Sequence, residues 1–248
     1  YNGNPNSLHT DGQVAQEKLD ESRAKVAEAI NAAKPNEIYF TSGGSEADNQ
    51  ALISAARGLV KKGKKHLISL NIEHHAILHT LAKLEKEGFE VTLLKPQPNG
   101  IVDVKDVENA IREDTALVSI MFANNEMGAI QPIAEIGKLC HDKRVLFHTD
   151  AVQAVAHLPI DVQAMNIDML SMSAHKFHGP KGVGALYARN GIRLINVIEG
   201  GAQERGKRAG TVNVPGNAAL AAALEDGVLH MEENARKTAA LRDRLIKG

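Results

Sequence analysis

The chain has 248 residues, of which 43% are hydrophobic and 24% charged, with a formal net charge of −1. These values are typical of one or two globular domains with a sizeable core. The near-neutral charge gives no global attraction to nucleic acid or to an anionic membrane. No apolar run approaches roughly 18 residues, and the first residues lack the basic and apolar regions of a signal peptide. We therefore expect no nucleic-acid partner and no membrane segment. The single cysteine, Cys140, is compatible with a reducing compartment such as the cytoplasm.

Short apolar runs alternate with amphipathic stretches along the chain. The runs predict buried strands at Glu37–Thr41, His66–Leu70, Val91–Leu94, Ala116–Met121, Val145–Thr149, Asp168–Met172 and Val183–Ala188. The stretches predict helices at Gln13–Asn31, Ala76–Glu87, Val104–Ile111 with Asp103 as N-cap, Ile133–Asp142 and about 217–247. Strands that alternate with helices indicate βαβ units. We predict an α/β fold whose mainly parallel seven-stranded sheet carries helices on both faces.

Three segments that follow predicted strands are candidate ligand sites, because such sheets bind ligands at the carboxyl ends of their strands. The turn at 41–45 (TSGGS) leads into a helix and could cradle an anion, or it could be an ordinary turn with Ser45 as N-cap. Asp150 could face a ligand or cap a helix. Lys176 could be a surface lysine, or an amine nucleophile that forms a Schiff base.

Other motifs carry weaker signals. The segment Gly201–Lys207 is close to a P-loop, but Arg208 stands where magnesium needs Ser or Thr, and Val214-Pro215 soon follows. We therefore reject a nucleotide-hydrolase loop, although the segment could hold a phosphate or gate a site. The 11 histidines form no H-E-x-x-H motif and no spaced Cys/His set, so we predict no metal site. Cys140 is predicted to be a core cysteine rather than a nucleophile.

Together, these segments suit one cofactor. A phosphate cradle at a helix start, an aspartate and a lysine after two other strands, and the nearby Gln153 are what pyridoxal phosphate needs. Lys176 would hold the cofactor aldehyde, and Asp150 would pair with the pyridinium nitrogen. That pairing would keep the ring able to accept negative charge from the substrate.

The sequence resembles the class V, fold-type I pyridoxal phosphate enzymes, specifically the cysteine desulfurases of iron–sulfur cluster assembly. The matching stretches occur in the family's order across nearly the whole chain. They are 3–9 (GNPNSLH), 40–49 (FTSGGSEADN), 73–76 (EHHA), 123–128 (ANNEMG), 147–153 (FHTDAVQ), 173–182 (SAHKFHGPKG) and 201–213 (GAQERGKRAGTVN). The last three together are highly specific. The family usually has Thr at Ser45 and commonly Ala at Gly44.

The resemblance implies a role for each matching position. Lys176 would carry the cofactor and move the substrate α-proton, and His74 would stack on the ring and assist proton transfer. Asp150 would bind the pyridine nitrogen, while Gln153 and Asn125 would reach the ring hydroxyl. The phosphate would be held by Gly44, Ser45, Ser173 and His175, and by Thr211 reaching across from a neighbouring subunit.

The resemblance also implies an activity and partners. The expected reaction is a sulfurtransferase-type removal of sulfur from L-cysteine, which leaves L-alanine and an enzyme persulfide for an iron–sulfur scaffold or other acceptor protein. A homodimer is expected. We expect residues 1–248 to be the large, cofactor-binding domain, incomplete at its N-terminus, with the helix at about 217–247 leading to an absent small C-terminal domain that carries the nucleophilic cysteine. This would leave the chain inactive alone. Alternatives are a related class V enzyme such as a selenocysteine lyase, or a non-catalytic dimerisation or docking module.

Overall fold

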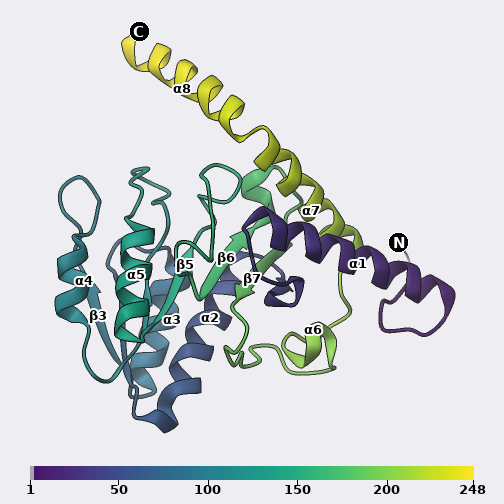
Figure 1. The fold of residues 1–248 in the computed structure, drawn as a ribbon, viewed down its shortest axis with the longest axis horizontal. Coiled ribbons are helices and arrows are strands. Elements are labelled where there is room, and N and C mark those ends of the chain that lie inside the picture. The colour runs from purple at the N-terminus through teal and green to yellow at the C-terminus, as the bar shows by residue number, and fades with distance from the viewer. Residues whose placement is uncertain (1–2) are drawn as a thin grey trace.

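The structure is a computed structural model that describes residues 3–248. Tyr1 and Asn2 lie outside the described residues. They belong to the N-terminal stretch that we do not expect to be a signal peptide. No helix within residues 3–248 is both long enough and apolar enough to cross a membrane. The described chain folds around one central sheet (Figure 1).

The sheet has seven strands in the order β1-β7-β6-β5-β4-β2-β3. Their bounds are Ile38–Thr41 (β1), His66–Leu70 (β2), Glu90–Leu94 (β3), Thr115–Ser119 (β4), Leu146–Asp150 (β5), Met169–Ser173 (β6) and Gly184–Ala188 (β7). Only β7 runs antiparallel to its neighbours among these strands, which confirms the mainly parallel prediction. Each predicted strand is present. The bounds of β2 are as predicted, and no end of the other strands is displaced by more than two residues. Asp150 and Ser173 are the last residues of β5 and β6.

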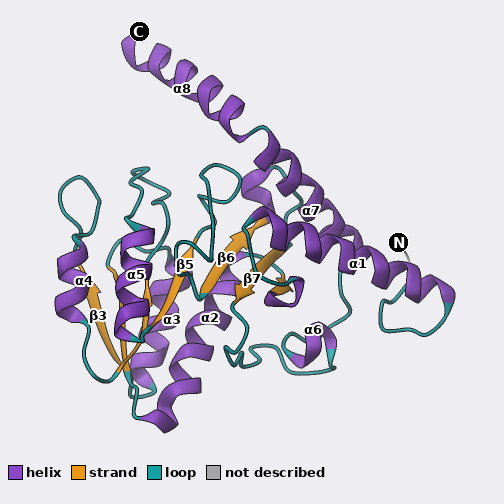
Figure 2. Ribbon diagram, in the orientation of Figure 1, coloured by secondary structure: helices purple, strands orange, loops and turns teal. Residues whose placement is uncertain are grey.

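The described chain contains eight α-helices besides the sheet (Figure 2). They are α1 (Thr10–Ala29), α2 (Gly44–Leu59), α3 (His75–Lys86), α4 (Val104–Ala110), α5 (Ile133–Lys143), α6 (Gln203–Gly206), α7 (Val214–Leu229) and α8 (Met231–Lys247). Short 3-10 turns lie at Pro35–Glu37, Val60–Lys62 and Ala174–Phe177. The predicted N-cap Asp103 is confirmed, because its side chain accepts a hydrogen bond from the amide of Lys105 at the start of α4.

Two separate apolar cores lie on the two faces of the sheet, as the prediction of helices on both faces requires. On one face, α2 and α3 supply residues such as Leu52 and Leu81, which pack with Leu117 of β4. On the other face, α1, α5 and α7 pack against residues such as Phe147 of β5 and Leu170 of β6. Alternate residues of one strand therefore enter different cores, because strand side chains alternate between faces.

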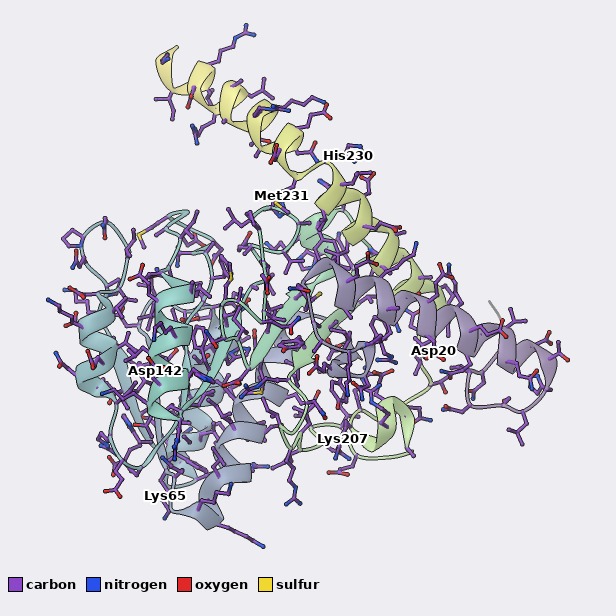
Figure 3. The ribbon with its side chains drawn as sticks, in the orientation of Figure 1. Asp20, Lys65, Asp142, Lys207, His230 and Met231 are labelled. Carbon is purple, nitrogen blue, oxygen red and sulfur yellow. The ribbon has the colours of Figure 1, made fainter. Side chains whose placement is uncertain are left out.

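The predicted long helix at about 217–247 is wrong in one respect, because it consists of two helices. The break lies at His230, whose φ of −103° and ψ of 12° end α7 before α8 begins at Met231. These two residues mark the junction in Figure 3. Beyond the junction, α8 extends away from the sheet, and none of its residues is buried (Figure 1).

The glycine- and arginine-rich segment forms a loop fastened to the edge of the sheet. Glu204 is buried and receives two hydrogen bonds from the guanidinium of Arg23, at 2.7 and 2.8 Å, and one from the amide of Phe40. Arg208 pairs with Glu46 of α2 at 2.9 Å. Glu204 and Arg205 have φ values of 46° and 57°, a region that non-glycine residues rarely adopt. Glu204 and Arg208 of this loop are therefore engaged with the protein itself.

Candidate active site

A cavity of about 260 Å³ opens at the carboxyl ends of the parallel strands, next to the N-termini of α2 and α3. Ligand sites of α/β sheets are expected in this position. The cavity contains nine of the ten residues predicted from the sequence. Its lining residues are Gly44, Ser45, Asp48, His74, Met121, Ala123, Asn125, Asp150, Val152, Gln153, Ser173, His175 and Lys176.

One end of the cavity is an anion cradle at the start of α2. The first α-helical hydrogen bond runs from the amide of Ala47 to the carbonyl of Gly43. The backbone amides of α2 before Ala47 therefore have no hydrogen-bond partner inside the helix. Ser45 is not the N-cap. That position is Gly43, whose φ of 151° suits glycine and which supplies no capping side chain. The free amides and the helix dipole favour a bound anion.

Two further side chains reach the cradle from the end of β6. The Ser173 hydroxyl lies 2.9 Å from Nδ1 of His175, and both residues line the cavity. A serine and a histidine that already contact each other provide two polar groups for phosphate oxygens. Their positions agree with the predicted phosphate role of Ser173 and His175.

Gly44 is closely packed against the far wall of the cavity. A Cβ atom built on it would lie 2.6 Å from Cγ2 of Val152 and 3.6 Å from Cβ of Ser173. Real Cβ atoms do not approach that closely, so an alanine at this position would force Val152 to move. The branched side chain of Val152 occupies the space that an alanine methyl would need.

Asp150 provides a carboxylate to the cavity wall. It is 7% exposed, and its Oδ1 accepts a hydrogen bond of 2.9 Å from the amide of Val152. Burial raises the pKa of Asp150, and that hydrogen bond and the nearby His74 and Lys176 offset only part of the rise. A buried carboxylate with a backbone donor and a nearby lysine is suited to holding a protonated ring nitrogen.

Lys176 lies in the short 3-10 turn Ala174–Phe177 directly after β6, and it lines the cavity. His74 is the N-cap of α3, where its Nδ1 accepts a hydrogen bond of 3.1 Å from the amide of Ala76. That bond leaves Nε2 as the ring nitrogen available to a ligand. Asn125 donates to Glu126 at 2.6 Å and lines the cavity with Gln153. The structure thus brings an amine, an imidazole and two amides to one space.

Thr211 is the predicted site residue that the structure does not bring into this cavity. It lies along a separate small cavity of about 50 Å³ with Ser42, Arg208 and Asn213. Its predicted contact with a phosphate in a neighbouring subunit stays a prediction, because it concerns a second copy of the chain.

Four lining residues were not predicted from the sequence: Asp48, Met121, Ala123 and Val152. Asp48 is the polar one, and one signal could have identified it. It lies one helical turn after Gly44 and next to Ala47 and Ala51 on the buried face of α2. A charged residue on an apolar helix face at a ligand site indicates a specific environment.

Within residues 3–248, one group of three side chains of metal-binding type comes together. It consists of Asp48, His74 and Asp150, whose ligand atoms lie within 4.8 Å of one another. This group was not predicted from sequence spacing, because its members come from three different elements. These three residues line the same cavity as Lys176 and the anion cradle. An amine beside an anion cradle is typical of a site for an organic phosphate.

Cys140 lies far from this chemistry, inside the core under α5. It is fully buried, and burial raises the pKa of its thiol to about 12. A thiol with such a pKa is not a thiolate at neutral pH and is a poor nucleophile. The prediction of a core cysteine is confirmed.

The model of the aminotransferase class-V family matches residues 1–248. The chain belongs to this family. It is 56% identical over 246 residues to "Cysteine desulfurase IscS" of Clostridium botulinum, covering 99% of this chain and 62% of that protein. It is 52% identical to the protein of the same name from Methanosarcina thermophila, covering 99% of this chain and 60% of the relative.

Solved structures of class V members show the same fold. A "NifS-like protein" superposes with a TM-score of 0.95 at 41% identity, covering 99% of this chain and 67% of that one. A structure described as "SspA in complex with cysteine" superposes with a TM-score of 0.87 at 42% identity, covering 90% of this chain and 65% of that one. The seven-stranded fold predicted from the sequence is thus the fold of this enzyme family. The chain spans less than two thirds of the length of the bacterial and archaeal relatives.

Proposed function

We propose that residues 1–248 form the pyridoxal phosphate-binding part of a cysteine desulfurase. The observation that carries the proposal is the placement of Lys176, Asp150 and the α2 N-terminus around one cavity. The relatives named cysteine desulfurase and the relative described in complex with cysteine support L-cysteine as the substrate.

The residues present fit the cofactor in charge and in chemistry. The uncapped start of α2, with Ser45, Ser173 and His175, would hold the phosphate. The buried Asp150 would hold the pyridine nitrogen. Lys176 would hold the aldehyde, and Asn125 and Gln153 are placed for the ring hydroxyl. When bound, pyridoxal phosphate supplies an electron sink for negative charge at the substrate α-carbon.

The protein's own residues would then bind, orient and move protons. Asp150, whose pKa His74 and Lys176 lower against the effect of burial, would favour a protonated ring nitrogen. Lys176 takes a proton from the substrate α-carbon at Nζ and returns it to the product. His74, fixed through Nδ1, presents Nε2 as a second proton-transfer group. Cleavage of the C–S bond passes the sulfur to a cysteine thiolate as a persulfide and leaves alanine.

The acceptor thiol is not Cys140, because that side chain is buried and its pKa is raised. We propose that this thiol belongs to a further domain that follows α8, as the resemblance implies. We also propose that the protein is a homodimer in which Thr211 reaches the neighbouring site. Its partner would be an iron–sulfur scaffold or another sulfur-acceptor protein, and its location would be the cytoplasm.

The test combines cofactor uptake with turnover. Purified protein with added pyridoxal phosphate is expected to develop the visible absorbance of a lysine-bound cofactor. Alanine release from L-cysteine is expected from a version extended through the further domain. Cys140→Ser in that version should leave the rate unchanged. A colourless protein, or turnover of selenocysteine with none of cysteine, would contradict the proposal.

A further inference from the structure

A row of buried polar side chains crosses the sheet beneath α2. Ser119 of β4, His148 of β5 and Ser171 of β6 are each at most 1% exposed. Nδ1 of His148 lies 2.9 Å from the Ser119 hydroxyl, and Nε2 lies 3.0 Å from the Ser171 hydroxyl. At the end of the row, Nε2 of His148 lies 3.7 Å from Oδ1 of Asp48, a residue that is 1% exposed and lines the cavity.

The strand register places this row directly beside Asp150. In the parallel pair of β5 and β6, Asp150 is the partner of Ser171. His148 precedes Asp150 by two residues, so both side chains lie on the same face of β5. Ligand atoms of Asp48 and Asp150 lie within 4.8 Å of each other. Two carboxyl groups therefore share the end of the cavity proposed for the ring nitrogen.

Within the described residues, Asp48 forms no ion pair with a lysine or an arginine. The nearest basic nitrogen is Nε2 of His148, 3.7 Å from Oδ1. Burial lowers the pKa of His148 to about 3, so its imidazole is neutral and the contact is not an ion pair. Within residues 3–248, Oδ1 of Asp48 has no hydrogen-bond donor. The Ser171 hydroxyl is the group that favours the ionised form.

The charges around Asp48 point in the same direction. Burial raises the pKa of Asp48 well above its ordinary value, and Asp150 and Glu73 raise it further. Asp150, in contrast, has His74 and Lys176 close enough to lower its pKa. Two close carboxylates cannot both ionise cheaply in a buried site. Asp150, with Lys176 and His74 beside it, keeps the charge.

We propose that Asp48 is a neutral carboxylic acid at the end of the Ser171–His148 row, which leaves Asp150 as the single negative charge at this end of the cavity. Asp48 donates to the Ser171 hydroxyl, Ser171 donates to Nε2 of His148, and Nδ1–H of His148 donates to Ser119. The inference rests on the proposed cofactor site, where one carboxylate would meet one pyridinium.

The first test compares Asp48→Asn with Asp150→Asn in the cofactor-loaded protein. Asparagine is neutral and has the shape of the protonated acid, so the pH midpoint of the cofactor's visible absorbance should stay within about 0.3 units of the original protein. Asp150→Asn removes a real charge and should move that midpoint by about one unit or more. An Asp48→Asn shift as large as that of Asp150→Asn would overturn the proposal.

The second test uses the pH dependence of unfolding in the cofactor-free protein. Because folding raises the pKa of Asp48, the folded state keeps a proton that the unfolded state loses above about pH 4. Between about pH 5 and 7, the folding constant of the original protein should fall relative to that of Asp48→Asn by about tenfold per pH unit. The other groups that face Asp48, namely Glu73, His74, His148, Asp150 and Lys176, are the same in both proteins. A constant ratio would contradict a neutral Asp48.

The two proposals fail separately. If the original protein takes up no pyridoxal phosphate, the proposed function is wrong, and the unfolding test still decides the protonation of Asp48. If Asp48→Asn does not fold, carbon-13 NMR of the original protein labelled at its aspartate carboxyl groups replaces it. A carboxyl signal that stays at the protonated position at pH 7 is expected. Ionised positions for every aspartate would overturn the inference.

Discussion

The two faces of β5 have opposite chemistry, although they belong to the same five residues. Phe147 enters the apolar core under α1 and α5, while His148 and Asp150 face α2 together with Ser171 of β6. Burying polar groups costs free energy unless they find partners. The titratable residues of β5, His148 and Asp150, lie on the face that opens into the cavity, whereas Phe147 and Thr149 lie on the other face. One face thus stabilises the fold, and the other also arranges charge for a ligand.

The largest effect is expected at Asp150, on the face of β5 that faces α2. Asp150→Asn should remove the partner of the ring nitrogen and weaken cofactor binding by about 2–5 kcal/mol, because it leaves a buried pyridinium unpaired. Equilibrium titration with pyridoxal phosphate measures the loss. Folding should persist, which circular dichroism would check. Unchanged affinity would mean that Asp150 does not face the ring nitrogen.

A substitution on the other face should separate stability from the site. Ile136 of α5 is fully buried in the core that contains Phe147. Ile136→Ala should lower the free energy of unfolding by about 2–5 kcal/mol through lost packing and a cavity. Chemical denaturation gives the size of the loss. The cofactor affinity of the folded protein should be unchanged, and a parallel loss would show that the two faces are coupled.

The fit between Gly44 and Val152 tests the wall between the cradle and β5. Gly44→Ala should cost about 1–3 kcal/mol and weaken phosphate binding, because the new methyl group meets Cγ2 of Val152. Gly44→Ala combined with Val152→Ala should recover most of the loss, and Val152→Ala alone is the matched control. A double-mutant cycle on cofactor affinity and unfolding measures the coupling. Additive effects would contradict the steric explanation.

The smallest effect is expected on α8, which lies outside both cores. Leu241 is 67% exposed. Leu241→Ala in the 248-residue chain should change the free energy of unfolding by no more than about 0.5 kcal/mol. Thermal unfolding beside the Ile136→Ala variant provides the contrast. A large loss would show that this leucine packs against something that the chain's own fold does not provide.

The sequence was sufficient for the strands and for most of the site because both depend on local patterns. Apolar β-branched runs reveal buried strands, and residues that follow parallel strands must meet at one edge of the sheet. The C-terminal ends of β5 and β6 were predicted one residue too early because their hydrogen bonding continues one residue beyond the apolar run. Asp150 therefore lies in the ladder of β5 rather than in the following loop.

Features that depend on tertiary packing were beyond the sequence. The break at His230 has neither proline nor glycine, and Leu229, His230 and Met231 are all compatible with a continuous helix. Asp48 carries no motif of its own on α2. Its importance appears only when β5 and β6 bring His148 and Ser171 beneath it. Likewise, the packing of Val152 against Gly44 is a contact between distant segments.

The most direct measurement of the central claim is chemical trapping of the cofactor. The protein is incubated with pyridoxal phosphate, reduced with borohydride, digested and mapped by mass spectrometry, with Lys176→Ala and Lys181→Ala treated in parallel. The account predicts a single dominant modified peptide that contains Lys176, present in Lys181→Ala and absent from Lys176→Ala. Label spread over surface lysines, or unchanged labelling of Lys176→Ala, would contradict it.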